Sequence, residues 1–215
     1  LRQDSWGGLN RPTLLIIMAD LITVQEYKNA EGIVNAKEDS RLAIIVPQVS
    51  DLAKKYCGTS FVDYYSSDKT ETFSVNDNFT STIIVSESPL VSVTSVKERS
   101  TYDASYETLA TSDYEYYVDT AADAIVRTTK SGGKKAFPQG MGSVQIAYRA
   151  GYSAAPSDLK LALFDLVTYY LKDEHKERRT IAGATLQNQG TSGVRDNTDF
   201  PDHIKRVLDL YRVII

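Results

Sequence analysis

The segment from residue 144 to residue 170 constrains the fold most, because it joins a strand to a helix through a turn of specified residues. Apolar residues alternate with polar or small ones at its start, which predicts a strand with one buried face. Gly151 ends this strand, and Pro156 stands where a helix is expected to begin. Ser157 or Asp158 is expected to hold the free amides of the first helical turn.

The helix after Pro156 has a broad apolar stripe at Leu159, Leu161, Ala162, Leu163, Leu166, Val167 and Tyr170. Residues 183–197 are rich in Gly, Asn, Gln, Thr and Ser, so they predict a long loop. A last amphipathic helix is expected to begin at residues 200–202. Its apolar face is predicted to contain Ile204, Val207, Leu208 and Tyr211.

Two helices are predicted near the beginning of the chain. Residues 23–26, Thr-Val-Gln-Glu, fit a capping box, and Gly32 can end the short helix that follows. A second helix is expected over residues 39–56, closing before Gly58. Pro47 lies inside it and predicts either a kink or a later start of the helix.

Between these helical regions, residues 61–152 are dominated by Thr, Ser, Val, Tyr and Ile in short runs, which is typical of β structure. Seven strands are predicted, over residues 61–65, 71–75, 82–86, 91–99, 114–119, 124–128 and 143–149. The run Lys130 to Lys135 has the glycines and charges of an exposed loop, and it lacks the glycine spacing of a phosphate-binding loop.

These patterns predict an α+β fold, in which two N-terminal and two C-terminal helices form a four-helix bundle with an inserted antiparallel β-sheet module. The bundle is expected to comprise residues 18–60 and 153–215, and the β module residues 61–152. Residues 1–17 precede Met18 and are expected to be an N-terminal arm or a non-native extension.

Composition narrows the classes of function. The formal net charge of -4 argues against broad coating of nucleic acid, since that affinity comes from many Lys and Arg side chains. No apolar run approaches the length that spans a bilayer. A single cysteine, Cys57, excludes an internal disulfide and is expected to be a small apolar side chain near a helix end.

No constellation of residues predicts catalysis, a metal site or a cofactor. His175 and His203 stand in different predicted helices, without a ligand motif around them. Residues 196–199 lack the glycine and the closing glutamate of a calcium loop, so helix capping explains them better. Carboxylate pairs such as Asp113 with Glu115, or Asp119 with Asp123, are inevitable among 28 acidic residues. We therefore expect no enzyme, no metal and no cofactor.

The order of short motifs resembles that of the head-tail connector proteins, also called adaptor or head-completion proteins, of tailed bacteriophages and gene transfer agents. The matching segments are residues 21–28, 39–61, 89–96, 113–116 and 148–160, the last containing Tyr-Arg-Ala-Gly-Tyr and Pro-Ser-Asp-Leu-Lys. Together they extend over roughly residues 18–215, and none of them is catalytic.

The resemblance implies a homo-oligomeric ring, usually of twelve copies, at the head-tail junction of a virion assembled in the host cytoplasm. Such a ring docks beneath the portal protein, extends the DNA channel without sequence-specific binding, and offers a platform to a stopper or tail protein. No membrane is involved. From their position near the end of the chain, the residues expected to face the portal are Arg195, Asp196, Phe200, Tyr211 and Arg212.

Two alternatives stay open at the level of sequence. The chain could be another ring component of the neck or tail, such as a stopper or a tail terminator. It could also be a carbohydrate-binding or hydrolytic module that uses the tyrosine-rich β region.

Overall fold

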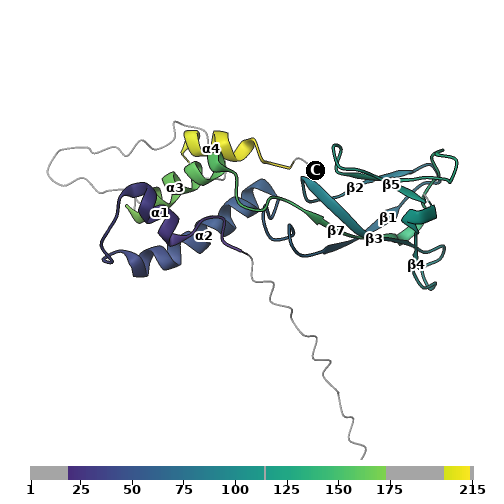
Figure 1. The fold of residues 1–215 in the computed structure, drawn as a ribbon, viewed down its shortest axis with the longest axis horizontal. Coiled ribbons are helices and arrows are strands. Elements are labelled where there is room, and N and C mark those ends of the chain that lie inside the picture. The colour runs from purple at the N-terminus through teal and green to yellow at the C-terminus, as the bar shows by residue number, and fades with distance from the viewer. Residues whose placement is uncertain (1–18, 114, 173–200, 214–215) are drawn as a thin grey trace, which may run out of the picture.

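The computed structural model describes residues 19–113, 115–172 and 201–213, which form four α-helices, a short 3-10 helix and seven strands. The helices α1 (Val24–Glu31), α2 (Asp39–Cys57), α3 (Ser157–Leu171) and α4 (Asp202–Asp209) pack together, and the strands lie beside them (Figure 1). The predicted α+β architecture, with antiparallel sheets inserted between two pairs of helices, is confirmed. We call these parts the helical module and the β module.

The N-terminal helices form largely as predicted. The Thr23 hydroxyl accepts a hydrogen bond from the amide of Glu26 at 3.1 Å, and the Glu26 carboxylate accepts one from the amide of Thr23 at 2.8 Å. This capping box opens α1, and Gly32 ends it in the left-handed conformation. Helix α2 runs from Asp39 through Pro47 to Cys57 without interruption, so the predicted later start is wrong.

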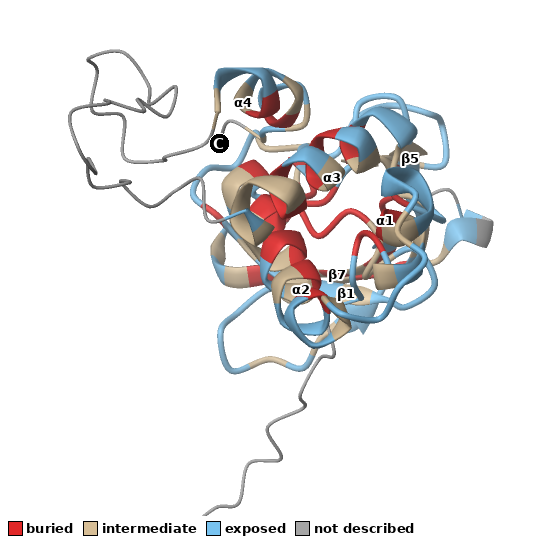
Figure 2. Cartoon of the chain, turned by 90° about the vertical axis from the view of Figure 1, so that its left-hand side faces the viewer, coloured by how far each residue is buried: buried red, intermediate tan, exposed pale blue. Residues whose placement is uncertain are grey.

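The helices share one apolar core. Viewed from the helical end of the molecule, the buried faces of α2 and α3 turn toward each other (Figure 2). The most deeply buried side chains include Tyr27, Leu42, Val46, Val49, Ala53, Leu159, Leu163, Leu166, Ile204 and Leu208. The predicted inner face of α4 is confirmed, with Ile204 and Leu208 buried and Val207 and Tyr211 packed against the core.

Helix α3 differs from its prediction in two details. Pro156 occupies the N-cap position, not the first helical position, and it has no side chain that can cap the helix. Leu161 belongs to the predicted stripe but is 63% exposed. The apolar stripe of α3 is therefore wider than the face that the neighbouring helices cover.

The β module consists of two sheets around one core. The strands β1 (Lys69–Val75), β7 (Gly140–Ala150), β3 (Leu90–Glu98) and β4 (Glu107–Thr108) form the first sheet in that order. The second contains β2 (Thr82–Ile84), β6 (Ala124–Arg127) and β5 (Tyr116–Asp119), and all pairings are antiparallel. The shared core includes Val96, Ile125, Phe137, Val144, Ile146 and Tyr148.

One predicted strand is wrong. Residues 61–65 form turns, and Phe61 has a φ of 60°. The ring of Phe61 packs in the helical core, edge-on to Tyr211 with centroids 5.6 Å apart. Burial of this ring from a turn overrides the β propensity of the local sequence. Strand β4 and the 3-10 helix Thr111–Asp113 were not predicted, because elements of two or three residues show no periodicity.

Gly151 fixes the junction between the two modules. Its amide donates to the carbonyl of Pro89 at 2.8 Å, and the next amide, of Tyr152, donates to the carbonyl of Phe61 at 2.7 Å. Its φ is +100°, and a Cβ atom added here would lie 2.1 Å from the Phe61 carbonyl oxygen. Both the conformation and the close approach therefore require glycine.

Buried charged side chains also connect the two modules at this junction. The Glu87 carboxylate accepts hydrogen bonds from the hydroxyls of Thr59 and Ser60 and from the Ser60 amide, each at 3.0 Å, and from Lys69 at 3.0 Å. Nearby, the Lys54 ammonium, at the end of α2, pairs with Asp63 at 2.8 Å. These contacts link the end of α2 to the beginning of the β module.

We predict that Gly151→Ala destabilises the protein by more than about 4 kcal/mol or prevents folding, because the added methyl group collides with backbone that cannot move aside. Chemical denaturation measures the change. Gly32→Ala is the matched control: its φ is +67° but nothing lies within 4 Å, so only about 1 to 2 kcal/mol is expected. Equal losses of stability in the two variants would show that the close approach to the Phe61 carbonyl does not cause the destabilisation.

Candidate assembly surfaces

The described residues contain no grouping that indicates catalysis. No group of three or more His, Cys, Asp or Glu side chains among them could hold a metal ion. His203 is exposed and lies 3.8 Å from Asp165, and His175 lies outside the described residues. None of the described helices has the length and apolar character needed to cross a membrane.

The carboxylate pairs seen in the sequence have structural partners. Asp123 accepts hydrogen bonds from the Leu90 amide and the Ser88 hydroxyl, and Asp119 accepts from the amides of two following residues. Asp113 pairs with Lys130 at 3.1 Å, and Glu115 accepts from the Ala110 amide. Each carboxylate thus stabilises a turn or a loop.

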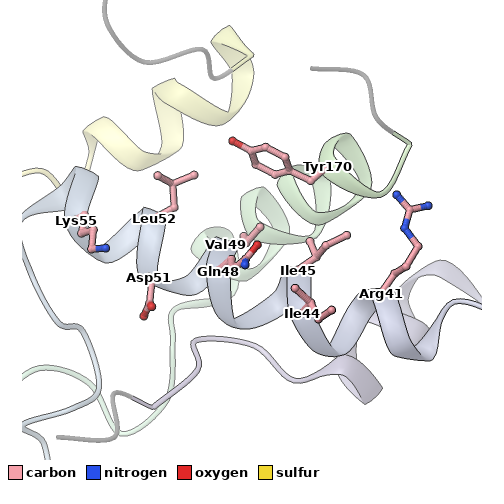
Figure 3. Close-up of a pocket in the computed structure, with 9 residues that line it drawn as sticks. All are labelled: Arg41, Ile44, Ile45, Gln48, Val49, Asp51, Leu52, Lys55 and Tyr170. Atoms are coloured by element: carbon pink, nitrogen blue, oxygen red, sulfur yellow. The ribbon is translucent and has the colours of Figure 1, made fainter. Parts of the chain in front are cut away.

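An apolar groove lies along the outer side of α2. It has a volume of ≈ 610 Å³ and is lined by Arg41, Ile44, Ile45, Gln48, Val49, Asp51, Leu52, Lys55 and Tyr170. We call it the α2 groove. Figure 3 shows Tyr170 reaching over it from α3, while Arg41 and Lys55 stand toward opposite ends.

The composition of the α2 groove suits contact with another protein. Its base is formed by Val49, which is buried, while Ile44 is 60% exposed. A branched apolar side chain in this position loses contact with water only if a second surface covers it. Ile44 was not among the predicted site residues, because the local pattern predicts only that residues 39–56 form a helix. The neighbouring residues Ile44 and Ile45 make the apolar side of α2 wider, and this was the feature of the sequence that could have indicated an exposed apolar surface.

The end of the chain forms a second surface. Tyr211 is one of the predicted site residues, and its hydroxyl donates a hydrogen bond to the Asp158 carboxylate at 2.7 Å. This hydrogen bond holds the pKa of the Asp158 carboxyl below its ordinary value. The guanidinium of Arg212 lies 5.6 Å from the centre of the Tyr56 ring. The side chains of these consecutive residues therefore contact different helices, Tyr211 contacting α3 and Arg212 contacting α2. The other predicted residues, Arg195, Asp196 and Phe200, lie outside the described residues.

Helix α4 is attached through several contacts around Cys57. The thiol donates to the Leu208 carbonyl at 3.5 Å, and the Cys57 carbonyl accepts from the Val213 amide at 2.9 Å. Burial raises the pKa of this thiol to about 12. Tyr56 adds a hydrogen bond to Asp209 at 2.5 Å. Just after α4, Leu210 is 76% exposed, and Arg212 is exposed as well.

Comparison with known proteins shows one family. The family model described as "Head completion protein" matches residues 20–214. A curated relative, the head completion protein of Escherichia phage T5, is 34% identical over 76 residues. That match spans 35% of this chain and 41% of the relative, so the chain covers less than half of the relative's length.

Solved structures share the fold. A chain from "Neck of empty GTA particle computed with C6 symmetry" matches with a TM-score of 0.54 and 16% identity, covering 91% of each chain. A chain from "Virion of native gene transfer agent (GTA) particle" has the same TM-score and coverage at 14% identity. A third, from "Neck of native GTA particle computed with C12 symmetry", has a TM-score of 0.50 at 16% identity, covering 92% of this chain and 95% of that one.

We predict that Cys57 in the folded protein resists a thiol reagent at pH 8 and that Leu208→Ala accelerates labelling by at least about tenfold. The Leu208 side chain is buried, and its truncation costs roughly 2 to 5 kcal/mol, which loosens α4 over the thiol. Leu210→Ala is the control, because this side chain is exposed and its loss leaves the core intact. Equal labelling of the two variants would contradict the role assigned to α4.

Proposed function

Because the chain belongs to the head completion protein family, as its ordered motifs predicted, we propose that it is a structural protein of the neck of a phage or phage-like particle. In this proposal, copies of the chain form a ring under the portal protein, extend the DNA channel and provide the surface to which the tail attaches. The observation that carries it is the family match over residues 20–214.

The fold is in accord with this role. Its likeness to chains of gene transfer agent particles extends over nine-tenths of the molecule and includes both modules. The described residues offer surfaces for other proteins, and the carboxylates of Asp113, Glu115, Asp119 and Asp123 serve internal contacts. A net charge of -4 also suits a channel wall, because fixed positive charge would retain the DNA phosphates.

We propose that the α2 groove receives the neighbouring copy in the ring. A ring requires a heterologous contact, in which one face of a copy meets a different face of the next. The outward side of α3 offers a complementary surface, since exposed Leu161 stands one turn before exposed Asp165. Leu161 can enter the apolar groove while Asp165 approaches its basic side chains, Arg41 and Lys55.

The portal side of the ring is proposed to include the end of the chain. Arg195, Asp196, Phe200, Tyr211 and Arg212 were expected there from their position. Tyr211 is engaged in holding α4 to Asp158, so we assign it a supporting role. Exposed Leu210 and Arg212 are better placed to touch a partner. Truncation of the chain would also remove Ile204 and Leu208 from the core, so point substitutions test this surface more cleanly.

We predict that Ile44→Cys combined with Leu161→Cys gives a ladder of disulfide-linked oligomers under oxidation, in the presence of the portal protein encoded by the same genome. The two positions meet across the proposed subunit contact, and Cys57 is too deeply buried to compete. Non-reducing gel electrophoresis measures the sizes of the linked oligomers. Either single variant should give no ladder. Dimers from Ile44→Cys alone would instead indicate a two-fold contact and contradict the ring arrangement.

We predict that Leu210→Asp combined with Arg212→Glu weakens binding to purified portal rings by at least about tenfold, because one change removes an apolar contact and the other reverses a charge. Co-sedimentation measures binding, and the thermal midpoint should change little because both side chains are exposed. Ile84→Thr, an exposed change in the β module, is the control. Binding equal to that of the unchanged protein would remove α4 from the portal surface.

A further inference from the structure

Basic residues are concentrated in one part of the β module. Residues 124–157 contain five Lys and Arg side chains and no Asp or Glu, although 28 of the 215 residues of the chain are acidic. Three of the five, Lys130, Lys134 and Lys135, are close together in the sequence and exposed. We call residues 129–135, in the loop that follows β6, the basic tip. A protein with a net charge of -4 thus carries a locally positive surface.

Hydrogen bonds hold the basic tip in one conformation. The Thr129 amide donates to the Gly133 carbonyl at 2.9 Å, and the Gly132 amide donates to the Thr129 carbonyl at 2.8 Å. The Thr129 hydroxyl accepts a hydrogen bond from the Gly133 amide at 3.2 Å. Gly132 has a φ of +81°, which permits this tight turn. The lysines therefore extend from an ordered turn, and a ligand that binds them does not have to order the backbone first.

The base of the basic tip is anchored in the β module. Just before the tip, Arg127 is buried and donates two hydrogen bonds to the Glu98 carboxylate, both at 3.0 Å. Just after it, Phe137 is buried, and its amide donates to the Thr80 carbonyl at 2.9 Å. Because Arg127 is engaged within the fold, the positive charge that the tip offers to a partner comes from its lysines.

The lysines of the basic tip are available to a ligand. Lys130 lies 3.1 Å from Asp113, but both side chains are exposed, and an ion pair of this kind contributes little to stability. Among the residues that the structure describes, Lys134 and Lys135 make no ion pair. Exposed ammonium groups of this kind can replace the counterions of a polyanion, and the release of those counterions favours binding.

The composition of the basic tip favours a chain of phosphates over a protein. Residues 128–135 include no large apolar side chain, whereas protein interfaces are depleted in lysine and are centred on apolar or aromatic anchors. Lysine binds phosphate as a point charge. The tip also has no Arg, Asn or Gln, which are the residues that most often read the edges of bases. Its chemistry therefore matches the DNA backbone, without preference for sequence.

We propose that the basic tip faces the DNA channel and binds the phosphate backbone of duplex DNA. This inference rests on the proposed function, because a ring repeats the tip in every copy and the tips together form a band of positive charge. An acidic wall lets DNA move, since it offers few cations to the phosphates. The band holds the DNA at one level of the channel, through counterion release and without base recognition.

The test measures binding of a short fluorescent DNA duplex of mixed sequence to the full chain. The chain is used in two forms, as rings assembled on the portal protein encoded by the same genome and immobilised at high density on beads, where many copies bind one duplex together. Portal protein without the chain gives the baseline. Raising the salt from about 50 to about 200 mM is expected to weaken binding about tenfold for each copy that uses Lys134 and Lys135, because each lysine contacts one phosphate.

The double variant Lys134→Gln with Lys135→Gln is expected to weaken DNA binding by at least about tenfold at low salt and to reduce its salt dependence. Lys37→Gln with Lys172→Gln is the matched control, because it removes the same charge from exposed positions of the helical module and should bind normally. Lys134→Arg with Lys135→Arg keeps the charge and should also bind normally. The thermal midpoint of all three variants should be unchanged, because these side chains are exposed.

Several results would overturn the inference. Normal DNA binding by the Lys134→Gln, Lys135→Gln variant would show that the basic tip is only a solvated loop. An equal loss in the control variant would show that only net charge matters. A loss in the arginine variant would show that the charge of the tip is not what binds. Loss of ring formation with DNA binding intact would show that the tip contacts an acidic protein surface.

The two forms of the chain separate this inference from the proposed function. If rings form on the portal and neither rings nor beads bind DNA through Lys134 and Lys135, the inference fails alone. If no rings form while the beads bind DNA through these lysines, the proposed function fails and the phosphate contact is supported. If neither rings nor DNA binding is observed, both fail.

Discussion

The close approach of Gly151 to the carbonyl of Phe61 is the constraint on which the relation between the two modules depends. A glycine at φ +100° lets the end of β7 pass against the turn that follows α2, at a distance that leaves no room for a Cβ atom. Phe61 has a left-handed φ of its own, and its ring enters the helical core. Two unusual backbone conformations thus stabilise each other, and the sheets leave the helices in one direction.

Buried charges make this junction specific as well as close. Glu87 receives hydrogen bonds from Thr59, Ser60 and Lys69, and the ion pair of Lys54 with Asp63 is almost fully buried. Removing one partner from such a pair costs roughly 3 to 5 kcal/mol, because the remaining charge is left without compensation in a dry environment. An alternative docking of the β module on α2 would incur this cost. The junction therefore favours a single orientation over a range of them.

The proposed role in a ring requires that the two modules keep a fixed relative orientation. In the proposed ring, the helical module supplies the contacts to neighbouring copies and to the portal, and the β module extends away from the helices (Figure 1). The carboxylates of Asp119 and Asp123 hold turns, and burial raises the pKa of the Cys57 thiol to about 12, so these groups serve the fold. In this proposal the protein is a spacer, and Gly151 and Glu87 hold its two modules in one relative orientation.

The sequence by itself determined the features that depend on residues close together in the chain. The capping box of Thr23 and Glu26, the glycine that ends α1 and the alternation along β7 follow from local sterics and periodicity. Tertiary structure alone decided the rest. Residues 61–65 have strand-forming composition but form turns, because burial of the Phe61 ring is worth more than β propensity. The exposure of Ile44 and Leu161, and the hydrogen bonds of Arg99 to the carbonyls of Gly142 and Met141, depend on packing between distant segments, which no local pattern encodes.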